Sequence, residues 1–402
     1  MSFSADTAQK ECFMANNYTT EDIVEVKKRE KRRKKRIKFL IILAVAAVAG
    51  GLYYTREKWL PKLQGIGEKY QTIINDGELA TGNFPIDISG GENYQMYYTD
   101  SDIYLMSDAY LYIYNQDGGL VDSRQHAYSN AVLKANEGFA LIYETGGNKF
   151  RLETERKTVY NESVDNDIVF GRLSEDGYVA IVTCSDKYAC SLIVYDNSGK
   201  VIYSRDCINR IIDVAFDDNS KGAVLSFVDA ENGAVVTRSE KISFDSKKSK
   251  WETDNFQTYC IDSSSYENGF VVLGDDKCAY YNNDGKRVAE YDYSGDFAGC
   301  DVNGGTAAVI LNDEERRKYN VMLMKGAKYE PIIIPADNEL RCVQIYDDFA
   351  YVMTKSSLKA YDFSGKLRST VDISDSYTGF RRSDKYIFLM GYDRVDRIDY
   401  ES

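Results

Sequence analysis

Four segments of the 402-residue chain share one pattern, and their regular spacing limits how the chain can fold. In each segment an alternating run ends in a tyrosine, an Asn or Asp follows, and a glycine stands four residues after the tyrosine. Glycine adopts tight-turn conformations at little cost, so each segment predicts strand, turn, strand. The segments are LYIYNQDGGLVDS from Leu111, LIVYDNSGKVIYS from Leu192, CAYYNNDGKRVAE from Cys278 and LKAYDFSGKLRST from Leu358.

The spacing of these hairpins points to a unit of about half their separation. Tyr114, Tyr195, Tyr281 and Tyr361 are 81, 86 and 80 residues apart. Weaker hairpin patterns fall midway, near residues 150–163, 234–254, 319–334 and 392–402. Roughly 40 residues holding four short strands, here lettered A to D, is the size of one blade of a β-propeller.

The chain contains eight such units, so the sequence predicts an all-β fold, an eight-bladed β-propeller over residues 84–402. A seven-bladed alternative would discard one weak unit. The last unit has only three strands, which would leave an open edge. We expect residues 84–89 (FPIDIS) to supply its fourth strand and close the ring. The expected inner strands begin near Tyr94, Ala131, Asp167, Arg210, Gln257, Phe297, Leu340 and Thr378.

The amino-acid composition is consistent with a β-strand fold and excludes several kinds of metal and catalytic site. The 33 tyrosines and 17 phenylalanines suit pleated, half-buried strands. The single histidine, His126, excludes sites with several histidine ligands, and we expect it on a surface loop. No stretch completes a calcium-binding loop or a serine-hydrolase nucleophile elbow. The sequence therefore predicts neither a metal nor a cofactor.

A cationic block followed by an apolar run predicts membrane insertion. Residues 27–38 (KKREKRRKKRIK) contain ten cations and one anion, and residues 39–54 (FLIILAVAAVAGGLYY) carry no charge. We predict a transmembrane helix at 37–55, with the amino-terminal side inside the cell. Residues 1–36 are then a basic cytoplasmic tail, and the propeller lies outside the cytoplasm on a single-pass anchor in the cell membrane.

Other interpretations of this region remain open. Ala47-Val48-Ala49 resembles a signal-peptide cleavage site, although the apolar run continues beyond it, which favours a retained signal anchor. A buried soluble helix is a further alternative. Basic runs also bind nucleic acid, but because this run abuts a predicted span, lipid explains it and we expect no nucleic-acid partner. Residues 56–83 predict a helical stalk or linker, with apolar residues at three- and four-residue steps.

The hairpins and the overall layout carry a resemblance to known proteins. Residues 359–366 (KAYDFSGK) resemble pyrroloquinoline-quinone-type propeller repeats. The order of basic tail, span, stalk and eight blades resembles an uncharacterised family of single-pass, membrane-anchored propellers of Gram-positive bacteria. The tryptophan that usually ends the quinone-type repeat is absent, since Trp59 and Trp251 are the only tryptophans. The resemblance therefore implies a fold and no quinone binding or catalytic activity.

Strand direction divides the propeller into two rims. Because successive antiparallel strands alternate, the A–B and C–D turns lie on one rim, here called the turn rim. The B–C and D–A loops lie on the other, the loop rim. The stalk enters a D strand, so we expect the turn rim to face the bilayer and the loop rim to face outward. Exposed loops on a rigid scaffold commonly bind partners. The candidate loop-rim residues are Asp229, Glu231, Tyr293, Glu314, Glu315, Arg316, Arg317 and Tyr377.

Seven of the eight cysteines fall in the propeller. Cys184 and Cys190 bracket a short loop between two strands, which suggests a disulfide. Cys260, Cys300 and Cys342 are 40 and 42 residues apart, at corresponding places on three inner strands. A thiolate metal site there is conceivable, but small buried residues filling the inner ring explain the spacing better.

These features predict a non-catalytic binding or scaffold module for a protein or cell-envelope partner. Beyond residue 54 the chain has 39 basic and 57 acidic residues, so a neutral or basic partner is favoured. Two alternatives remain: a sensor that passes binding to the tail, and a cell-envelope hydrolase. A deep, carboxylate-lined central cleft would support the hydrolase, whereas a channel filled by Tyr and Phe would weaken it.

Overall fold

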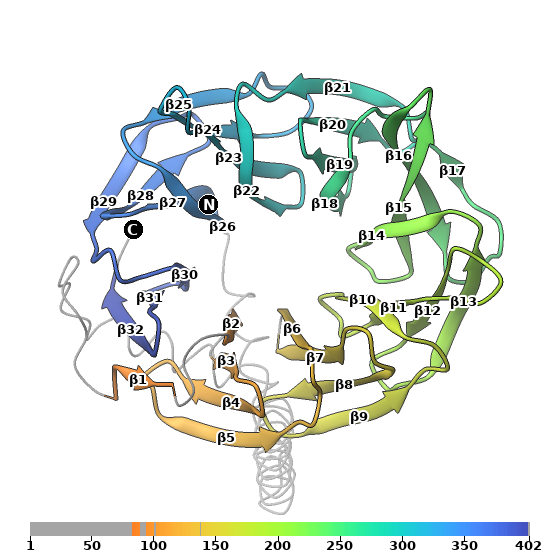
Figure 1. Ribbon diagram of the computed structural model, residues 1–402, viewed down its shortest axis with the longest axis horizontal. Helices are drawn as coiled ribbons and strands as arrows, with labels where there is room; N and C mark the ends of the chain where they lie inside the picture. Colours follow the sequence, from red (N-terminus) through yellow and green to blue (C-terminus); the bar gives the residue numbers. More distant parts are fainter. Residues whose placement is uncertain (1–82, 89–93, 100–101, 137, 401–402) are drawn as a thin grey trace, which may run out of the picture. The chain divides into compact units, whose positions relative to one another are not determined.

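The computed structural model describes residues 83–88, 94–99, 102–136 and 138–400. Within these ranges there are eight four-stranded antiparallel sheets arranged around an axis, an eight-bladed β-propeller (Figure 1). The prediction of eight blades is confirmed, and the seven-bladed alternative is wrong. The predicted tail, transmembrane helix and stalk, and with them the sensor hypothesis, fall on residues outside the described ranges. No helix in the described residues is long and apolar enough to cross a membrane.

Blades 1 to 4 follow one another along the chain, each with its strands in the order A, B, C, D from the axis outward. Blade 1 contains β2 (Gln95–Thr99), β3 (Asp102–Met106), β4 (Tyr110–Asn115) and β5 (Leu120–Gln125). Blade 2 contains β6 (Ala131–Asn136), β7 (Phe139–Glu144), β8 (Lys149–Thr154) and β9 (Thr158–Ser163). Blade 3 contains β10 (Ile168–Leu173), β11 (Val179–Thr183), β12 (Cys190–Tyr195) and β13 (Val201–Cys207). Blade 4 contains β14 (Arg210–Phe216), β15 (Gly222–Glu231), β16 (Ala234–Ser243) and β17 (Trp251–Glu252).

Blades 5 to 7 repeat this order, and blade 8 contains both ends of the propeller. Blade 5 contains β18 (Cys260–Tyr266), β19 (Gly269–Gly274), β20 (Lys277–Asn282) and β21 (Arg287–Asp292). Blade 6 contains β22 (Asp296–Asn303), β23 (Thr306–Asp313), β24 (Lys318–Met324) and β25 (Ile332–Ala336). Blade 7 contains β26 (Leu340–Tyr346), β27 (Phe349–Thr354), β28 (Ser357–Asp362) and β29 (Leu367–Asp372). Blade 8 contains β30 (Gly379–Arg382), β31 (Tyr386–Met390), β32 (Arg394–Asp399) and β1 (Ile86–Asp87).

The ring closes as expected, because β1 supplies the strand that the last unit lacks. β1 pairs antiparallel with β32, with Ile86 opposite Val395 and Asp87 opposite Arg394. Figure 1 shows β1 at the outer edge of this blade, beside β5 of blade 1. Joining the two ends of the propeller in one sheet removes the open edge that a three-stranded last blade would leave.

The repeated glycine turns take the form that their sequence predicts. Gly118, Gly199, Gly285 and Gly365 have φ between 75° and 87°, the left-handed region that favours glycine. The Asn or Asp that precedes each turn accepts backbone N–H groups; Asp362, for example, accepts from Ser364 (2.9 Å) and Lys366 (3.0 Å). These local bonds explain the Tyr-Asn/Asp-x-x-Gly pattern.

The core lies between the blades. The second strands are buried over most of their length, since each blade is covered by a neighbour on both faces. All five residues of β3 and of β11 are buried, whereas β15 extends beyond the core at its carboxyl end. One cluster joins Val182 of blade 3 to Ile211 and Leu225 of blade 4. These strands therefore read as continuous apolar runs instead of alternating ones.

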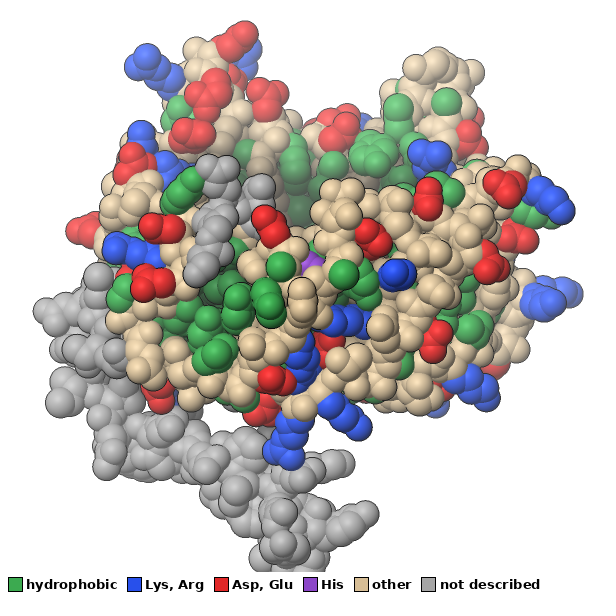
Figure 2. All heavy atoms as spheres, turned by 60° about the horizontal axis from the view of Figure 1, so that its bottom comes forward, with side chains coloured by type: hydrophobic (Ala, Val, Ile, Leu, Met, Phe, Trp, Pro, Cys, Tyr) green, Lys and Arg blue, Asp and Glu red, His purple; other side chains and the backbone are tan. Residues whose placement is uncertain are grey.

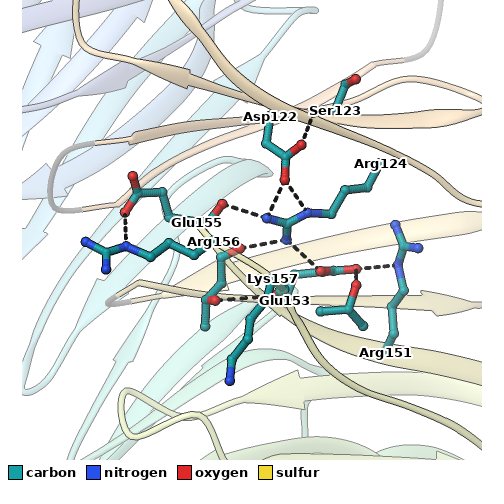
Figure 3. Close-up of polar contacts among 10 residues, drawn as sticks. Asp122, Ser123, Arg124, Arg151, Glu153, Glu155, Arg156 and Lys157 are labelled. Atoms are coloured by element: carbon teal, nitrogen blue, oxygen red, sulfur yellow. Dashed lines mark hydrogen bonds and ion pairs between the residues drawn. The ribbon is translucent and has the colours of Figure 1, made fainter.

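Ion pairs connect outer parts of adjacent blades. Arg124 on β5 donates to the Glu153 carboxylate on β8 (2.7 Å), and Arg151 pairs with the same carboxylate (2.8 Å) (Figure 3). Glu153 is fully buried, so these partners are needed to offset the loss of its hydration. Arg205 on β13 and Glu240 on β16 form a second pair of this kind between blades 3 and 4.

The surface carries charges of both signs. Figure 2 shows one face, on which acidic and basic side chains are interspersed among patches of hydrophobic ones. His126 departs from its predicted surface position: it is 5% exposed, and its Nε2 lies 2.9 Å from the Ser107 carbonyl oxygen. The loop that follows β5 folds back against blade 2, where Arg151 donates to the carbonyl of Gln125.

Candidate functional site

A central cavity of about 1040 Å³ lies at the carboxyl ends of the inner strands. All eight A strands contribute to its wall, from residues 97–99 of β2 round to 381–382 of β30. A–B turns also line it, including Glu175, Asp218 and Gly304. Since these turns belong to the turn rim, the cavity lies at that rim and not at the loop rim.

Side chains on the inner strands also join neighbouring blades. Gln95 of blade 1 accepts the Leu133 N–H of blade 2, and Gln344 of blade 7 accepts the Arg382 N–H of blade 8, both at 2.9 Å. Arg381 donates to the Met96 carbonyl (2.9 Å) and so ties blade 8 to blade 1. These bonds hold the wall of the cavity in a fixed arrangement.

One carboxylate on this ring is fully paired. Asp213 of β14 is fully buried; it accepts from Arg172 Nε (2.7 Å) and from the Ser263 hydroxyl (2.6 Å). The adjacent Asp213 charge raises the pKa of Arg172 above its ordinary value. Asp213 therefore links blades 3, 4 and 5 and serves a structural purpose.

Two neighbouring carboxylates on the wall have no cationic partner. Asp262 of β18 and Asp301 of β22 are half-buried, and no ion pair reaches either of them within the described residues. Burial, helped by the Asp213 charge, raises the pKa of Asp262 to about 6. Burial also raises the pKa of Asp301 to about 6, although the Ile345 N–H donates to its carboxylate (2.6 Å). The Arg172 charge acts on Asp262 and the Arg381 charge acts on Asp301 from beyond ion-pair distance, and each offsets the effect of burial only in part. Half-buried carboxylates whose charge is incompletely balanced are costly, so the pair attracts cations.

The wall on blades 7, 8 and 1 is aromatic and basic. The Arg381 guanidinium stacks 5.2 Å from the Tyr97 ring centroid, and no described carboxylate pairs with it. Arg382 is 2% exposed and lies over the Tyr346, Tyr351 and Tyr400 rings. Six acidic and three basic side chains line the cavity altogether, so the excess charge is negative.

The predicted loop-rim residues lie on separate blades, and none of them lines the cavity. Asp229 and Glu231 are exposed at the β15–β16 hairpin of blade 4. Each accepts a single asparagine amide, Asp229 from Asn209 (2.9 Å) and Glu231 from Asn255 (3.0 Å). These neutral bonds leave both charges free to meet solvent.

The second predicted loop joins β23 to β24 in blade 6. Glu314, Glu315, Arg316 and Arg317 are all exposed. Arg316 pairs with Asp313 at 3.6 Å, and Arg317 has φ of 51°, a left-handed turn position. No bond among the described residues connects this loop with the one in blade 4, so the structure does not gather the predicted residues into one site.

The two predicted tyrosines are not exposed, which corrects the expectation that they contact a partner. Tyr377 is 4% exposed, and its hydroxyl donates to Asp396 (2.8 Å) inside the core of blade 8. Tyr293 is half-buried, packs against Phe297 and has a buried hydroxyl. Both belong to D–A connections whose aromatic rings fill the space between blades. They are packing residues and not exposed contacts.

The predicted Cys184–Cys190 disulfide is not formed in the structure, where both thiols, like that of Cys207, are free. Cys184 is exposed after β11, whereas Cys190 is buried at the start of β12. Of the three inner-strand cysteines, Cys260 is buried and the other two are half-buried. They occupy three different blades, and no group able to hold a metal occurs in the described residues.

One family model matches part of the chain. Residues 81–258 match a family of unknown function, DUF5711. The matched stretch spans β1 and the four blades from β2 to β17. No curated protein matches the sequence.

Solved structures share the fold at low identity. The computationally designed protein Ika8 is similar with a TM-score of 0.60 and 11% identity, covering 78% of this chain and 98% of that one. Sqt1 of Saccharomyces cerevisiae is similar at 0.60 and 9% identity, covering 82% and 100%. BamB of Moraxella catarrhalis is similar at 0.52 and 10% identity, covering 80% and 99%. These likenesses show a propeller fold alone.

Sequence reasoning missed the cavity carboxylates, although a signal for them exists. Asp213, Asp262 and Asp301 each stand in the inner strand of successive units, where apolar residues were expected. Asp301 directly follows Cys300, and Asp262 stands two residues after Cys260, so both lie beside the cysteines whose repeat was noted. An acidic residue recurring in an inner strand would have pointed to the axis of the propeller.

Proposed function

We propose that the chain is a membrane-tethered, extracytoplasmic binding module, without catalytic activity, whose central cavity receives a cationic side chain of a protein or cell-envelope partner. The main support is the pair Asp262 and Asp301, which line a cavity of about 1040 Å³ without an ion-pair partner in the described residues. A lysine ammonium group supplies the missing positive charge, and nearby tyrosine rings favour a cation. The cationic block and the apolar run support the membrane anchor.

The position of the cavity also bears on how a partner approaches. β1 enters the propeller at the turn rim, where Asn83 lies against the Gly118 turn. The cavity lies at this same rim. If the stalk leads from this point to the bilayer, the partner reaches the cavity along the membrane surface. A membrane-proximal basic segment of a neighbouring protein fits that approach.

The test measures binding of a lysine peptide to the full chain in detergent by isothermal titration calorimetry. Acetyl-Gly-Lys-Gly-amide is expected to bind, and acetyl-Gly-Gln-Gly-amide, which lacks the charge, is not. Replacing both carboxylates (Asp262→Asn with Asp301→Asn) is expected to weaken lysine-peptide binding roughly 30-fold or more, because a desolvated charge contact is lost.

A matched loop-rim variant controls for total charge. Glu314→Gln with Glu315→Gln removes the same two charges from the exposed β23–β24 loop, and we expect its affinity to stay within about twofold, because exposed charges are screened. Equal losses in both double variants, or equal binding of the two peptides, would refute the cavity as the cation site.

A second candidate function has one observation in its favour. The cavity is carboxylate-lined and not filled by aromatic rings, which is the feature expected of a hydrolase. A carboxyl group with a pKa near 6 suits general acid catalysis, and glycosidases use two carboxyl groups. Incubation of the purified chain with cell-wall glycan tests it. Release of reducing ends that disappears in Asp262→Asn and in Asp301→Asn would favour the hydrolase over the binding module.

A further inference from the structure

Cys190 and Cys207 stand opposite each other on the two outer strands of blade 3. Cys190 begins β12, Cys207 ends β13, and they are register partners in the antiparallel pair. Directly opposite residues in such a pair point to the same face of the sheet. Their exposed fractions are 1% and 2%, and both belong to the core shared by blades 3 and 4.

The spacing of such a pair suits a disulfide. Opposite residues in an antiparallel pair have Cα atoms about 4.5–5.5 Å apart, inside the roughly 4.4–6.8 Å range that disulfides take. Cys184, the partner expected from sequence, instead follows β11, is exposed, and is not a register partner of Cys190.

The surroundings prepare Cys190 as the nucleophile. The Ile211 N–H donates to its sulfur (3.3 Å), and the Cys190 thiol in turn donates to the Asn209 carbonyl oxygen (3.5 Å). Interaction with the opposite Cys207 thiol, together with the hydrogen bond from Ile211, lowers the pKa of Cys190 to about 7, against the effect of burial. The same contact and burial raise the pKa of Cys207. At neutral pH one thiol of the pair is thus partly ionised, and thiolates are the attacking species in disulfide exchange.

We propose that Cys190 and Cys207 are joined by a disulfide in the mature protein. This rests on the proposed position of the propeller outside the cytoplasm, where disulfides persist. The oxidant is a thiol-exchanging disulfide, either a small molecule or an oxidoreductase. The Cys190 thiolate attacks it, one thiolate leaves, and a mixed disulfide forms. Cys207 then loses its proton to water and attacks the Cys190 sulfur, which releases the second thiolate. The two cysteines lose two electrons and two protons, and the oxidant becomes two thiols.

Because both sulfurs are buried in the folded protein, the proposed disulfide forms before folding is complete. With both sulfurs in the core, exchange requires that blade 3 be open toward blade 4, as it is while the chain folds. At that stage the Ile211 bond from blade 4 is not yet formed, and the pairing of Cys190 with Cys207 within blade 3 brings the two thiols together. After the blades close, the bond is inaccessible to reductants. It links the outermost strand of blade 3 to the strand beside it.

Peptide mapping tests the proposal in cells and separates the two possible partners of Cys190. Cells producing the full chain are denatured in N-ethylmaleimide to block free thiols, and the protein is digested with trypsin without reduction. Cys184, Cys190 and Cys207 fall in different tryptic peptides, residues 173–187, 188–200 and 206–210. The expected product is peptide 188–200 joined to 206–210, with a mass that splits into the two peptides on reduction. Maleimide on both Cys190 and Cys207, or a link between 173–187 and 188–200, would overturn it.

Variants and a refolding experiment complete the test. Cys184→Ser is expected to leave the linked peptide unchanged, whereas Cys207→Ser removes it. Purified wild-type chain is also reduced, unfolded and refolded with oxidised glutathione. Formation of the linked peptide there supports the geometry independently of cellular location, and its absence contradicts the proposal. Neither cysteine lines the cavity, so the lysine-peptide titration is expected to be the same with the pair oxidised or reduced, and the two proposals fail separately.

Discussion

The two rims of the propeller differ in what their charges contact. On the loop rim, the charged residues of the β15–β16 and β23–β24 hairpins are exposed and make only short-range, solvent-facing contacts. On the turn rim, the ends of the inner strands surround a cavity and hold carboxylates that are half-buried there. A charge in water is cheap, whereas a half-buried charge without a partner is costly. The turn rim is therefore where an incoming cation gains most.

The largest contrast between the rims is expected in stability. Asp213→Asn leaves the half-buried Arg172 against a buried neutral amide and breaks the link between three blades, and we expect the free energy of unfolding to fall by roughly 3 kcal/mol. Asp229→Asn, on the exposed loop rim, is expected to change it by less than about 0.5 kcal/mol. Urea denaturation of both variants measures the difference. Similar values for the two would mean that the inner ring is as loosely held as the loops.

The next contrast concerns pH. With pKa values about 6, Asp262 and Asp301 are about nine-tenths ionised at pH 7 and about one-tenth at pH 5. We expect lysine-peptide affinity to fall about tenfold over this range, since the lysine keeps its charge while the carboxylates lose theirs. Calorimetry at both pH values measures it. An unchanged affinity would show that these carboxylates do not hold the cation.

Replacing a cavity carboxylate that has no ion pair is expected to raise the free energy of unfolding slightly, the opposite of the loss expected for Asp213→Asn. The raised pKa of such a carboxylate means that the folded state holds the proton more tightly than the unfolded chain, so stability falls as pH rises from about 4 through about 6. Asp262→Asn removes that cost, and we expect about 1 kcal/mol of added stability at pH 7 and none at pH 4. Urea midpoints at the two pH values test this. A destabilised variant at pH 7 would show that Asp262 is structurally paired.

The smallest effect is expected on the loop rim. The Arg316 side chain is 75% exposed and lies 3.6 Å from Asp313, so water and salt screen this pair. Arg316→Ala is expected to change the free energy of unfolding by less than about 0.5 kcal/mol. A larger loss, measured by the same denaturation, would place this loop among the rigid parts of the fold and weaken the distinction between the rims.

The fold could be predicted because its signal is local and repeated. A glycine with positive φ after an Asn or Asp that caps the turn appears in four of the blades, and fixed spacing between these turns gives the size of one blade. The inner strands begin within a few residues of the expected positions. The closing strand at Ile86 followed from the physical argument that a propeller does not leave an edge unpaired.

The cavity could not be located in this way, because a strand's register decides where its side chains point. The inner strands of blades 4 and 5 shift register between Ile211 and Asp213 and between Cys260 and Asp262. One extra residue in a strand turns every following side chain to the other face. Such bulges carry no turn-like sequence signal. The prediction that Tyr377 is exposed was wrong for a related reason. Its polar neighbours in the sequence indicated exposure, but its side chain points inward and its hydroxyl donates to Asp396.

Photo-crosslinking in intact cells tests most directly whether partners bind at the turn rim. A benzophenone amino acid is placed at Asn303, an exposed residue on the wall of the cavity, or at Glu315, an exposed residue of the loop rim. After irradiation, covalent adducts of the full chain are separated by size and identified by mass spectrometry. The proposed function predicts a discrete protein or glycan adduct from position 303 that decreases when Asp262→Asn and Asp301→Asn are present, and none from position 315. An adduct from position 315 alone would contradict it and return the binding site to the outer loops.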